Sequence, residues 1–292
     1  MKETIANAWL KFLEDRFRAK INPSEYILAY SGGKDSHLLY WFIKEWLKED
    51  SIQIVGVNTS FEIPEIRDRI IKYSDVVLKP AKHRMNIKTE YGIPCFTKTQ
   101  DEYIYRYQNG NRSKNTMRAV MGENVKFNLN KHARELLLSG NLHKVSNKCC
   151  YYNKELPLMR YQNAHGKKAI IGVRQSESIT RKSKYNTCLQ KNGDFAPLYD
   201  FSDDLIDLIY EVYQIEIPRC YCYLSRTGCA GCPYGRNTET ELGLIPDGMR
   251  KHIIEYFQES YDVLGVNYKE IQLSIEVRHG ILQQQEGDSK TV

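Results

Sequence analysis

The sequence of 292 residues contains no uninterrupted apolar run of about 18 residues, the length that a membrane-spanning helix needs. Its first residues, Met1 to Thr4, lead into amphipathic sequence with acidic residues and not into the apolar core of a secretion signal. We therefore expect a cytoplasmic protein without a membrane partner. Because 41% of the residues are hydrophobic, the chain can bury the core of a globular protein.

The Walker phosphate-binding loop is also absent, since no glycine is followed after four residues by Gly-Lys-Ser or Gly-Lys-Thr. The chain has a different glycine loop, Ser31-Gly32-Gly33-Lys34-Asp35-Ser36, between an apolar run and a segment with apolar residues at helical spacing. The loop would thus open a helix, whose first N–H groups and positive dipole end attract anions. Since glycine allows close backbone approach and Lys34 adds charge, the pattern predicts a polyphosphate site. An ordinary glycine turn that caps a helix is the alternative.

Strand and helix patterns alternate in the first part of the chain. Short apolar runs at 26–30, 52–57 and 75–78 predict strands, and amphipathic periodicity predicts helices over 4–18 and 63–73. This alternation is typical of an α/β fold with a doubly wound parallel sheet.

The pattern weakens between 79 and 131 and then returns. We expect a nucleotide-binding α/β domain over 1–200 and a helical and loop region over 201–292 that carries a Cys-x-x-Cys motif. The polar tail after Gly280 is expected to fray. The later elements predicted by periodicity are a strand over 168–173 and helices near 133–138, 154–161, 203–214 and 249–257.

Eight cysteines in a chain of this size and expected compartment are more typical of ligands, redox groups or buried small residues than of disulfides. The adjacent pair Cys149 and Cys150 and the pair Cys229 and Cys232 together supply four thiolates. Four thiolates suit a four-iron four-sulfur cluster or a tetrahedral zinc ion. Adjacent cysteines reach one small ion only with strain, which favours the cluster. Taken alone, Cys149 and Cys150 would be read as two buried small residues.

Further short motifs accompany the loop and the cysteines. They are Asn58-Thr59 with Glu62 to Glu65, Lys154 after the cysteine pair, Gly172-Val173-Arg174 with Glu177, Ser178 and Arg181, Pro197-Leu198, and Arg226-Thr227-Gly228 before Cys229. In order and spacing, these motifs resemble the phosphoadenosine phosphosulfate reductase family of the PP-loop ATP pyrophosphatases. The resemblance runs through most of residues 26–235.

The resemblance implies a fold of the adenine nucleotide alpha-hydrolase type, with the nucleotide at the carboxyl edge of the strands. It further implies a four-iron four-sulfur cluster beside the nucleotide, with Lys154 near the cluster. The implied cluster ligands are Cys149, Cys150, Cys229 and Cys232.

For ATP, the resemblance implies that the loop holds the β and γ phosphates and that Mg²⁺ offsets the charge of the departing pyrophosphate. Asn58 and Gly172 would join Ser31, Gly32, Gly33, Lys34, Asp35 and Ser36 in binding the nucleotide. Arg174 and Arg181 would lie near the phosphates or the acceptor, since a guanidinium grips oxyanions in bidentate fashion; exposed surface arginines are the alternative. The implied catalytic residues are Lys34, Asp35, Lys154, Arg174 and Arg181.

Two features depart from sulfonucleotide reductases, which generally lack the loop lysine and carry a nucleophilic cysteine in a C-terminal tail. Here Lys34 is present and no cysteine follows Cys232. Without a tail thiol, a thiosulfonate intermediate has no evident attacker. The combination is more similar to the ATP pyrophosphatase subunit of DNA phosphorothioation systems and to phage members of the family.

That similarity implies an enzyme that adenylates an acceptor with ATP for sulfur transfer. Its implied partners are an adenine nucleotide, a nucleic acid as acceptor and a sulfur-donor protein such as a cysteine desulfurase. Two other interpretations stay open. One is a reductase that acts on adenylyl sulfate with another thiol, and the other is a nucleotide- or nucleic-acid-binding module with a structural metal site.

Two groups of residues stay without an assigned role. Each cysteine outside the two pairs could carry a persulfide, although a buried or incidental thiol is the more ordinary reading. The basic and aromatic stretch from Tyr103 to Arg134 could follow a phosphate backbone or form a solvated helical face. The unassigned cysteines are Cys95, Cys188, Cys220 and Cys222.

Overall fold

The computed structural model describes residues 1–124, 127–177, 181–182 and 185–271. It divides the chain into two compact units, each made of two separate segments. The sheet unit comprises 1–81 and 153–227, and the helical unit comprises 82–152 and 228–292. The units are therefore interleaved along the sequence, whereas the expected domains meet only once, at residue 200.

The sheet unit contains a four-stranded parallel sheet in the order β3-β2-β1-β4. Residue Ile27 of β1 pairs with Gln53 of β2 on one side, and Ala29 of β1 pairs with Ile171 of β4 on the other. The direction in which strands are added thus reverses at β1, and a ligand crevice forms at such a switch point. The strands are β1 (Tyr26–Tyr30), β2 (Gln53–Val57), β3 (Val76–Leu78) and β4 (Lys168–Ile171).

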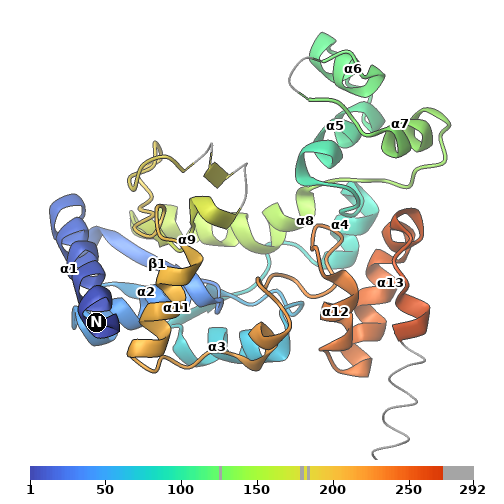
Figure 1. Ribbon diagram of the computed structural model, residues 1–292. Helices are drawn as coiled ribbons and strands as arrows, with labels where there is room; N and C mark the ends of the chain where they lie inside the picture. Colours follow the sequence, from blue (N-terminus) through green and yellow to red (C-terminus); the bar gives the residue numbers. More distant parts are fainter. Residues whose placement is uncertain (125–126, 178–180, 183–184, 272–292) are drawn as a thin grey trace, which may run out of the picture. The chain divides into compact units, whose positions relative to one another are not determined.

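Helices cover both faces of this sheet. In Figure 1, α9 lies on one side of the strands and α3 on the other, and both contact β2. The α/β fold with a parallel sheet is confirmed, and the apolar runs of β1, β2 and β4 form strands whose side chains are mostly buried. The helices are α1 (Lys2–Lys20), α2 (Lys34–Trp41) with the π-helical turn η2 (Phe42–Trp46), α3 (Pro64–Tyr73), α9 (Leu156–His165) after η3 (Tyr151–Glu155), and α11 (Asp203–Val212), with short 3-10 turns at η1 (Pro23–Glu25), η4 (Gln175–Glu177) and η5 (Arg219–Cys222).

The helical unit packs around a small core of its own, which includes Cys95, Ile104 and Val120. Three of its helices begin at residues whose side chains accept a backbone N–H of the first turn: Thr97, Ser113 and Asn130. The stretch 79–131, where the sequence pattern weakens, contains α4, α5 and α6. The helices are α4 (Arg84–Tyr91), α5 (Lys98–Gln108), α6 (Lys114–Met121), α7 (Lys131–Leu138), α8 (Lys148–Cys150), α12 (Thr238–Gly243) and α13 (Asp247–Leu264).

Within the described ranges, no helix is both long and apolar enough to cross a membrane. The tail after Gly280 and Ser178 of the predicted motif lie outside the described residues.

Candidate functional site

The glycine loop turns sharply between β1 and α2. Gly32 has a φ of +72°, and a Cβ built on it would lie 2.7 Å from the carbonyl oxygen of Ile66. Both the backbone angle and the close approach therefore require glycine. Gly33 follows in an extended conformation and caps α2, so that the loop leads directly into the first turn of the helix.

The two loop serines have different surroundings. Ser36 is buried, and its hydroxyl donates to the Gly33 carbonyl at 3.0 Å and accepts the Ser31 N–H at 3.2 Å. Ser31 is exposed, and its hydroxyl lies 3.0 Å from that of Ser36. Ser36 thus holds the loop in shape, while Ser31 is the serine that a ligand can reach.

Gly172 lies behind the loop, just beyond β4. A Cβ on Gly172 would come within 2.9 Å of the Ser36 nitrogen and 3.0 Å of the Asp35 carbonyl carbon. The missing side chain allows the end of β4 to contact the start of α2. Gly172 therefore shapes the site by close packing.

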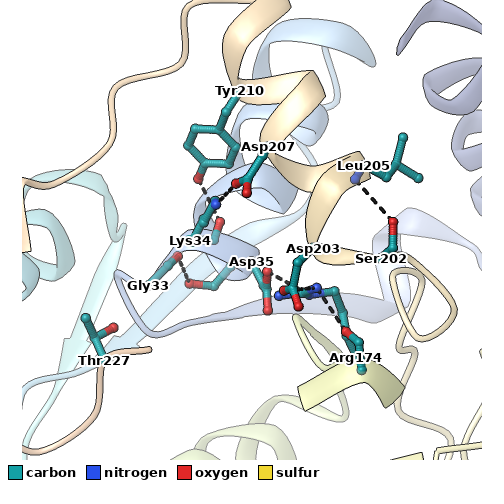
Figure 2. A network of polar contacts seen from close by, with 12 residues as sticks. Gly33, Lys34, Asp35, Arg174, Ser202, Asp203, Leu205, Asp207, Tyr210 and Thr227 are labelled. Carbon is teal, nitrogen blue, oxygen red and sulfur yellow. Dashed lines mark hydrogen bonds and ion pairs between the residues drawn. The ribbon is translucent and has the colours of Figure 1, made fainter. Parts of the chain in front are cut away.

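Lys34 is held by α11, as Figure 2 shows. Its ammonium pairs with the carboxylate of Asp207 and lies 5.7 Å from the ring centre of Tyr210. The Tyr210 hydroxyl donates to the Lys34 carbonyl at 2.7 Å. Burial lowers the pKa of Lys34, against the opposing charge of Asp35. A phosphate that bound Lys34 would have to compete with Asp207.

Asp35 forms the second ion pair of the loop. Arg174 Nε lies 3.0 Å from Asp35 Oδ1, and Arg174 Nη1 lies 2.7 Å from Asp203 Oδ1 on α11 (Figure 2). Burial alone would lower the pKa of Arg174, but the two carboxylates outweigh it and the pKa is raised. Asp203 and Asp207 thus sit one helical turn apart and pair with Arg174 and Lys34.

Arg181 adds positive charge near this pair. Burial lowers the pKa of its guanidinium, and the charge of Arg226 lowers it further. Arg181 also interacts electrostatically with Asp35 and Arg174. Arg181 is half-buried and Arg226 is exposed. Because an anion would offset the repulsion that Arg226 exerts on Arg181, this part of the sheet unit is favourable for phosphate.

The loop that follows β2 begins with Asn58 and is contacted by Lys154 at Glu62. The Asn58 side chain accepts the Ser60 N–H at 2.9 Å, and Ser60 has a left-handed φ of +64°, a conformation that favours glycine. Lys154 Nζ lies 3.6 Å from Oε1 of the buried Glu62, whose other oxygen accepts the Thr59 N–H at 3.1 Å. Asn58 therefore supports a turn, and Lys154 belongs to the sheet unit.

All four paired cysteines fall in the helical unit. Burial raises the pKa of Cys149 to about 12, and the neighbouring Cys229 and Cys150 contribute to this shift. Burial also raises the pKa of Cys232, again with contributions from the other three. The fold therefore brings two distant segments close enough for their thiols to interact electrostatically.

The turn between Cys229 and Cys232 is tightly fixed. Gly231 has a φ of +66°, and a Cβ on it would lie 2.7 Å from the Tyr261 hydroxyl. Its N–H donates to Glu241 at 2.9 Å, and its carbonyl accepts from Tyr261. The Tyr256 hydroxyl lies 4.0 Å from the sulfur of Cys149. The positions of these thiols are thus set by the surrounding helices.

The chemistry of this donor set fits a metal centre, because thiols that raise one another's pKa ionise readily only beside a cation. Among the residues that the structure describes, no three His, Cys, Asp or Glu side chains are arranged as the ligands of a single ion. The fit therefore rests on the proximity of four thiols and not on a ready-made coordination geometry.

The remaining cysteines are dispersed. Cys95 lies in the core of the helical unit, and burial raises its pKa to about 12. Cys220 is buried in the sheet unit, where burial and Glu65 raise its pKa to about 12. Cys188 is half-buried and Cys222 is exposed.

The basic and aromatic stretch contributes partly to the fold. Tyr103 stacks on Phe127 with ring centres 5.2 Å apart, and Arg106 pairs with Glu102. Other cations of this stretch are exposed on α6 and just before it: Arg112, Lys114 and Arg118.

No protein-family model and no curated protein matches the chain. Among solved structures, it is similar to phosphoadenylyl-sulfate (PAPS) reductase from Candida auris in a phosphate complex, with 11% identity and a TM-score of 0.41. The similarity covers 76% of this chain and 90% of that one.

Sequence reasoning missed four residues of the site. They lie on α11 or shortly after it, and their sequence surroundings show no ligand motif. Two acidic residues four positions apart in a predicted helix were the only signal. The missed residues are Asp203, Asp207, Tyr210 and Tyr221.

Proposed function

We propose that the chain binds ATP at the glycine loop and transfers the adenylyl group to an acceptor. The observation that supports this most is the set of cations beside a glycine loop at the switch point of a parallel sheet. Such a site suits a polyphosphate, because helix N–H groups and guanidinium groups both bind phosphate oxygens. The cations are Lys34, Arg174, Arg181 and Arg226.

In this reaction an oxygen of the acceptor attacks the α-phosphorus. The bond between that phosphorus and the oxygen bridging to the β-phosphate breaks, and pyrophosphate leaves with the bonding electrons. Lys34 and the first N–H groups of α2 would hold the β and γ phosphates, and Arg174 would stabilise the charge that develops. Asp35 keeps Arg174 at the loop. Mg²⁺ would offset the remaining negative charge of the pyrophosphate.

We also propose that Cys149, Cys150, Cys229 and Cys232 hold a four-iron four-sulfur cluster, with zinc as the alternative. Adjacent cysteines suit a cluster, whose several irons can accept neighbouring ligands. When bound, the cluster would supply a site for sulfur or shape the acceptor site.

The purpose that we propose for adenylation is sulfur transfer. Attack by the terminal sulfur of a donor persulfide at the activated atom would form the acceptor–sulfur bond, break the bond to the adenylyl oxygen and release AMP. A further thiol would then attack the donor cysteine sulfur of the sulfur–sulfur bond, which leaves the sulfur on the acceptor and a disulfide on the donor. A cysteine desulfurase is the proposed class of donor. A nucleic acid is the proposed class of acceptor, supported by the exposed cations Arg112, Lys114 and Arg118.

Release of pyrophosphate from ATP by the pure protein tests the adenylation. Lys34→Ala should abolish it. Lys44→Ala is a matched control, because Lys34 and Lys44 are each 20% exposed and each pairs with an aspartate. Pyrophosphate release that is unchanged in Lys34→Ala would contradict the proposal. Sulfite release from adenylyl sulfate would instead indicate a reductase, and binding without turnover would indicate a nucleotide-binding module.

Anaerobic purification with an iron count and an absorption spectrum tests the metal. Cys149→Ser should lose most of the iron and the absorption of the cluster. Cys222→Ser should keep both, because Cys222 is exposed and lies outside the four-thiol set. If the protein is colourless and contains zinc, the four cysteines hold a zinc ion and not a cluster.

A further inference from the structure

A tyrosine hydroxyl occupies the anion-binding face of the glycine loop. The N–H of Lys34 donates to Tyr221 Oη at 2.8 Å, and Tyr221 Oη lies 3.0 Å from Thr227 Oγ1. A Cβ built on Gly33 would lie 3.2 Å from the Tyr221 oxygen and 3.3 Å from the Thr227 oxygen. Both hydroxyls therefore lie directly over the bare backbone of Gly33.

This is the place where a phosphate would bind. The N–H of Lys34 is the first of α2, and a phosphate at the helix start would accept hydrogen bonds from such groups. One N–H makes one strong hydrogen bond, so a phosphate oxygen and Tyr221 Oη compete for it. Glycine at position 33 leaves room for either oxygen.

Tyr221 is held in this position by its own turn. It lies in η5 (Arg219–Cys222), where the N–H of Cys220 donates to Glu65 on α3 at 2.9 Å. Burial raises the pKa of Tyr221, so that the phenol stays neutral. A neutral hydroxyl that accepts a helix N–H imitates a phosphate oxygen without its charge.

We infer that Tyr221 is an internal stand-in for a phosphate oxygen and that nucleotide binding displaces it together with the segment 219–227. The inference rests on the proposed function, since the displacing ligand is the polyphosphate of the nucleotide. The displaced segment continues through Gly228 into Cys229. Nucleotide binding and the cysteine turn are thereby linked through the backbone.

Binding of α,β-methylene ATP with Mg²⁺ to the full chain tests the inference. Tyr221→Phe removes the competing oxygen and should lower the Kd about three- to tenfold, the equivalent of one net hydrogen bond. Tyr223→Phe is the matched control, because Tyr223 is in the same segment and 65% exposed, and its Kd should equal that of the wild type. An unchanged or higher Kd in Tyr221→Phe overturns the inference.

Hydrogen exchange of the wild-type protein provides a second test that needs no variant. Peptides from 219–227 should exchange faster when the analogue is bound, because Tyr221 leaves the loop. Slower or unchanged exchange there overturns the inference.

Failure of the inference can be distinguished from failure of the proposed function. If the wild type binds no nucleotide, both proposals fail. If the wild type binds the nucleotide and Lys34→Ala does not, the proposed function holds. If in that case Tyr221→Phe binds the nucleotide no more tightly than the wild type, only the inference fails.

Discussion

Arg174 Nε lies 3.0 Å from Asp35 Oδ1, so that a residue just beyond β4 is tied to the second residue of α2. Both side chains are largely withdrawn from solvent. The pair therefore joins the two elements that border the switch point of the sheet. It also keeps a guanidinium at the loop.

Removing the Arg174 guanidinium should lower the free energy of unfolding much more than removing its exposed partner Asp203. Arg174→Ala leaves the Asp35 carboxylate buried without its cation, which should lower the free energy of unfolding by about 3 kcal/mol. Asp203→Ala should cost at most about 1 kcal/mol, because Asp203 is 69% exposed. Urea unfolding followed by tryptophan fluorescence measures this, since Trp9, Trp41 and Trp46 all lie in the sheet unit. Equal losses in the two variants would show that the Asp35–Arg174 pair does not stabilise the unit.

The pairing of Lys34 with Asp207 should oppose nucleotide binding. Asp207→Asn removes the competing carboxylate and should lower the Kd of Mg-ATP about two- to fivefold, the usual strength of a partly exposed ion pair. Asp204→Asn, an exposed position on the same helix, corrects for the general change in charge. Weaker binding in Asp207→Asn would mean that Asp207 supports the nucleotide site and does not compete with it. Isothermal titration calorimetry measures the Kd of Mg-ATP for the wild type and for both variants.

The tight turn at Gly32 can be separated from its left-handed backbone angle. Gly166 has a φ of +62° with nothing within 4 Å of an added Cβ, whereas a Cβ on Gly32 would lie 2.7 Å from a carbonyl oxygen. Gly166→Ala should therefore lower the free energy of unfolding by about 1 kcal/mol, which is the effect of the left-handed backbone angle alone. Gly32→Ala should lower the free energy of unfolding by at least about 2 kcal/mol more than Gly166→Ala does, because the backbone oxygen of Ile66 cannot move aside. Similar stabilities of the two variants in urea would contradict the packing argument.

The sheet unit should lose stability in mild acid through His37. Burial lowers the pKa of His37 from 6.5 to about 3, with Arg69 and Lys72 adding to the effect. The unfolded chain therefore binds a proton below pH 6.5 that the folded chain excludes, so stability falls as the pH falls. The loss should reach about 2 kcal/mol at pH 5 relative to pH 7.

His37→Gln should remove this part of the pH dependence, while His165→Gln should not, because His165 is exposed. The difference between the variants in unfolding free energy at pH 7 and pH 5 isolates the contribution of His37. If all three proteins show the same slope, His37 is protonated alike in the folded and unfolded chains.

Periodicity predicted the part of the fold that positions the loop, because β1 and α2 bury local apolar patterns. The helix over 203–214 was predicted from its apolar side, but its polar side bears Asp203 and Asp207, whose partners lie far away in sequence. The segment 79–131 escaped prediction because its helices bury few apolar side chains, with only Ile87 on α4 and only Ile104 on α5. Their cap residues Thr97 and Ser113 were the available signal.

The site residues divide in the same way. The glycine loop could be found because its residues are consecutive, whereas metal binding by the two cysteine pairs stays a prediction. The role of Tyr221 could not, since nothing near it in sequence reveals that its hydroxyl reaches the N–H of Lys34. The interleaving of the two units depends on packing between distant segments, which local patterns do not encode.

The interleaved order of the chain has a consequence for biosynthesis. Strand β1 is unpaired along one edge until β4 has been synthesised, and Cys229 and Cys232 follow later still. The ribosome must therefore release most of the polypeptide before the four sulfurs can meet. Any metal that these sulfurs hold together is loaded into a nearly finished chain, after the sheet has closed.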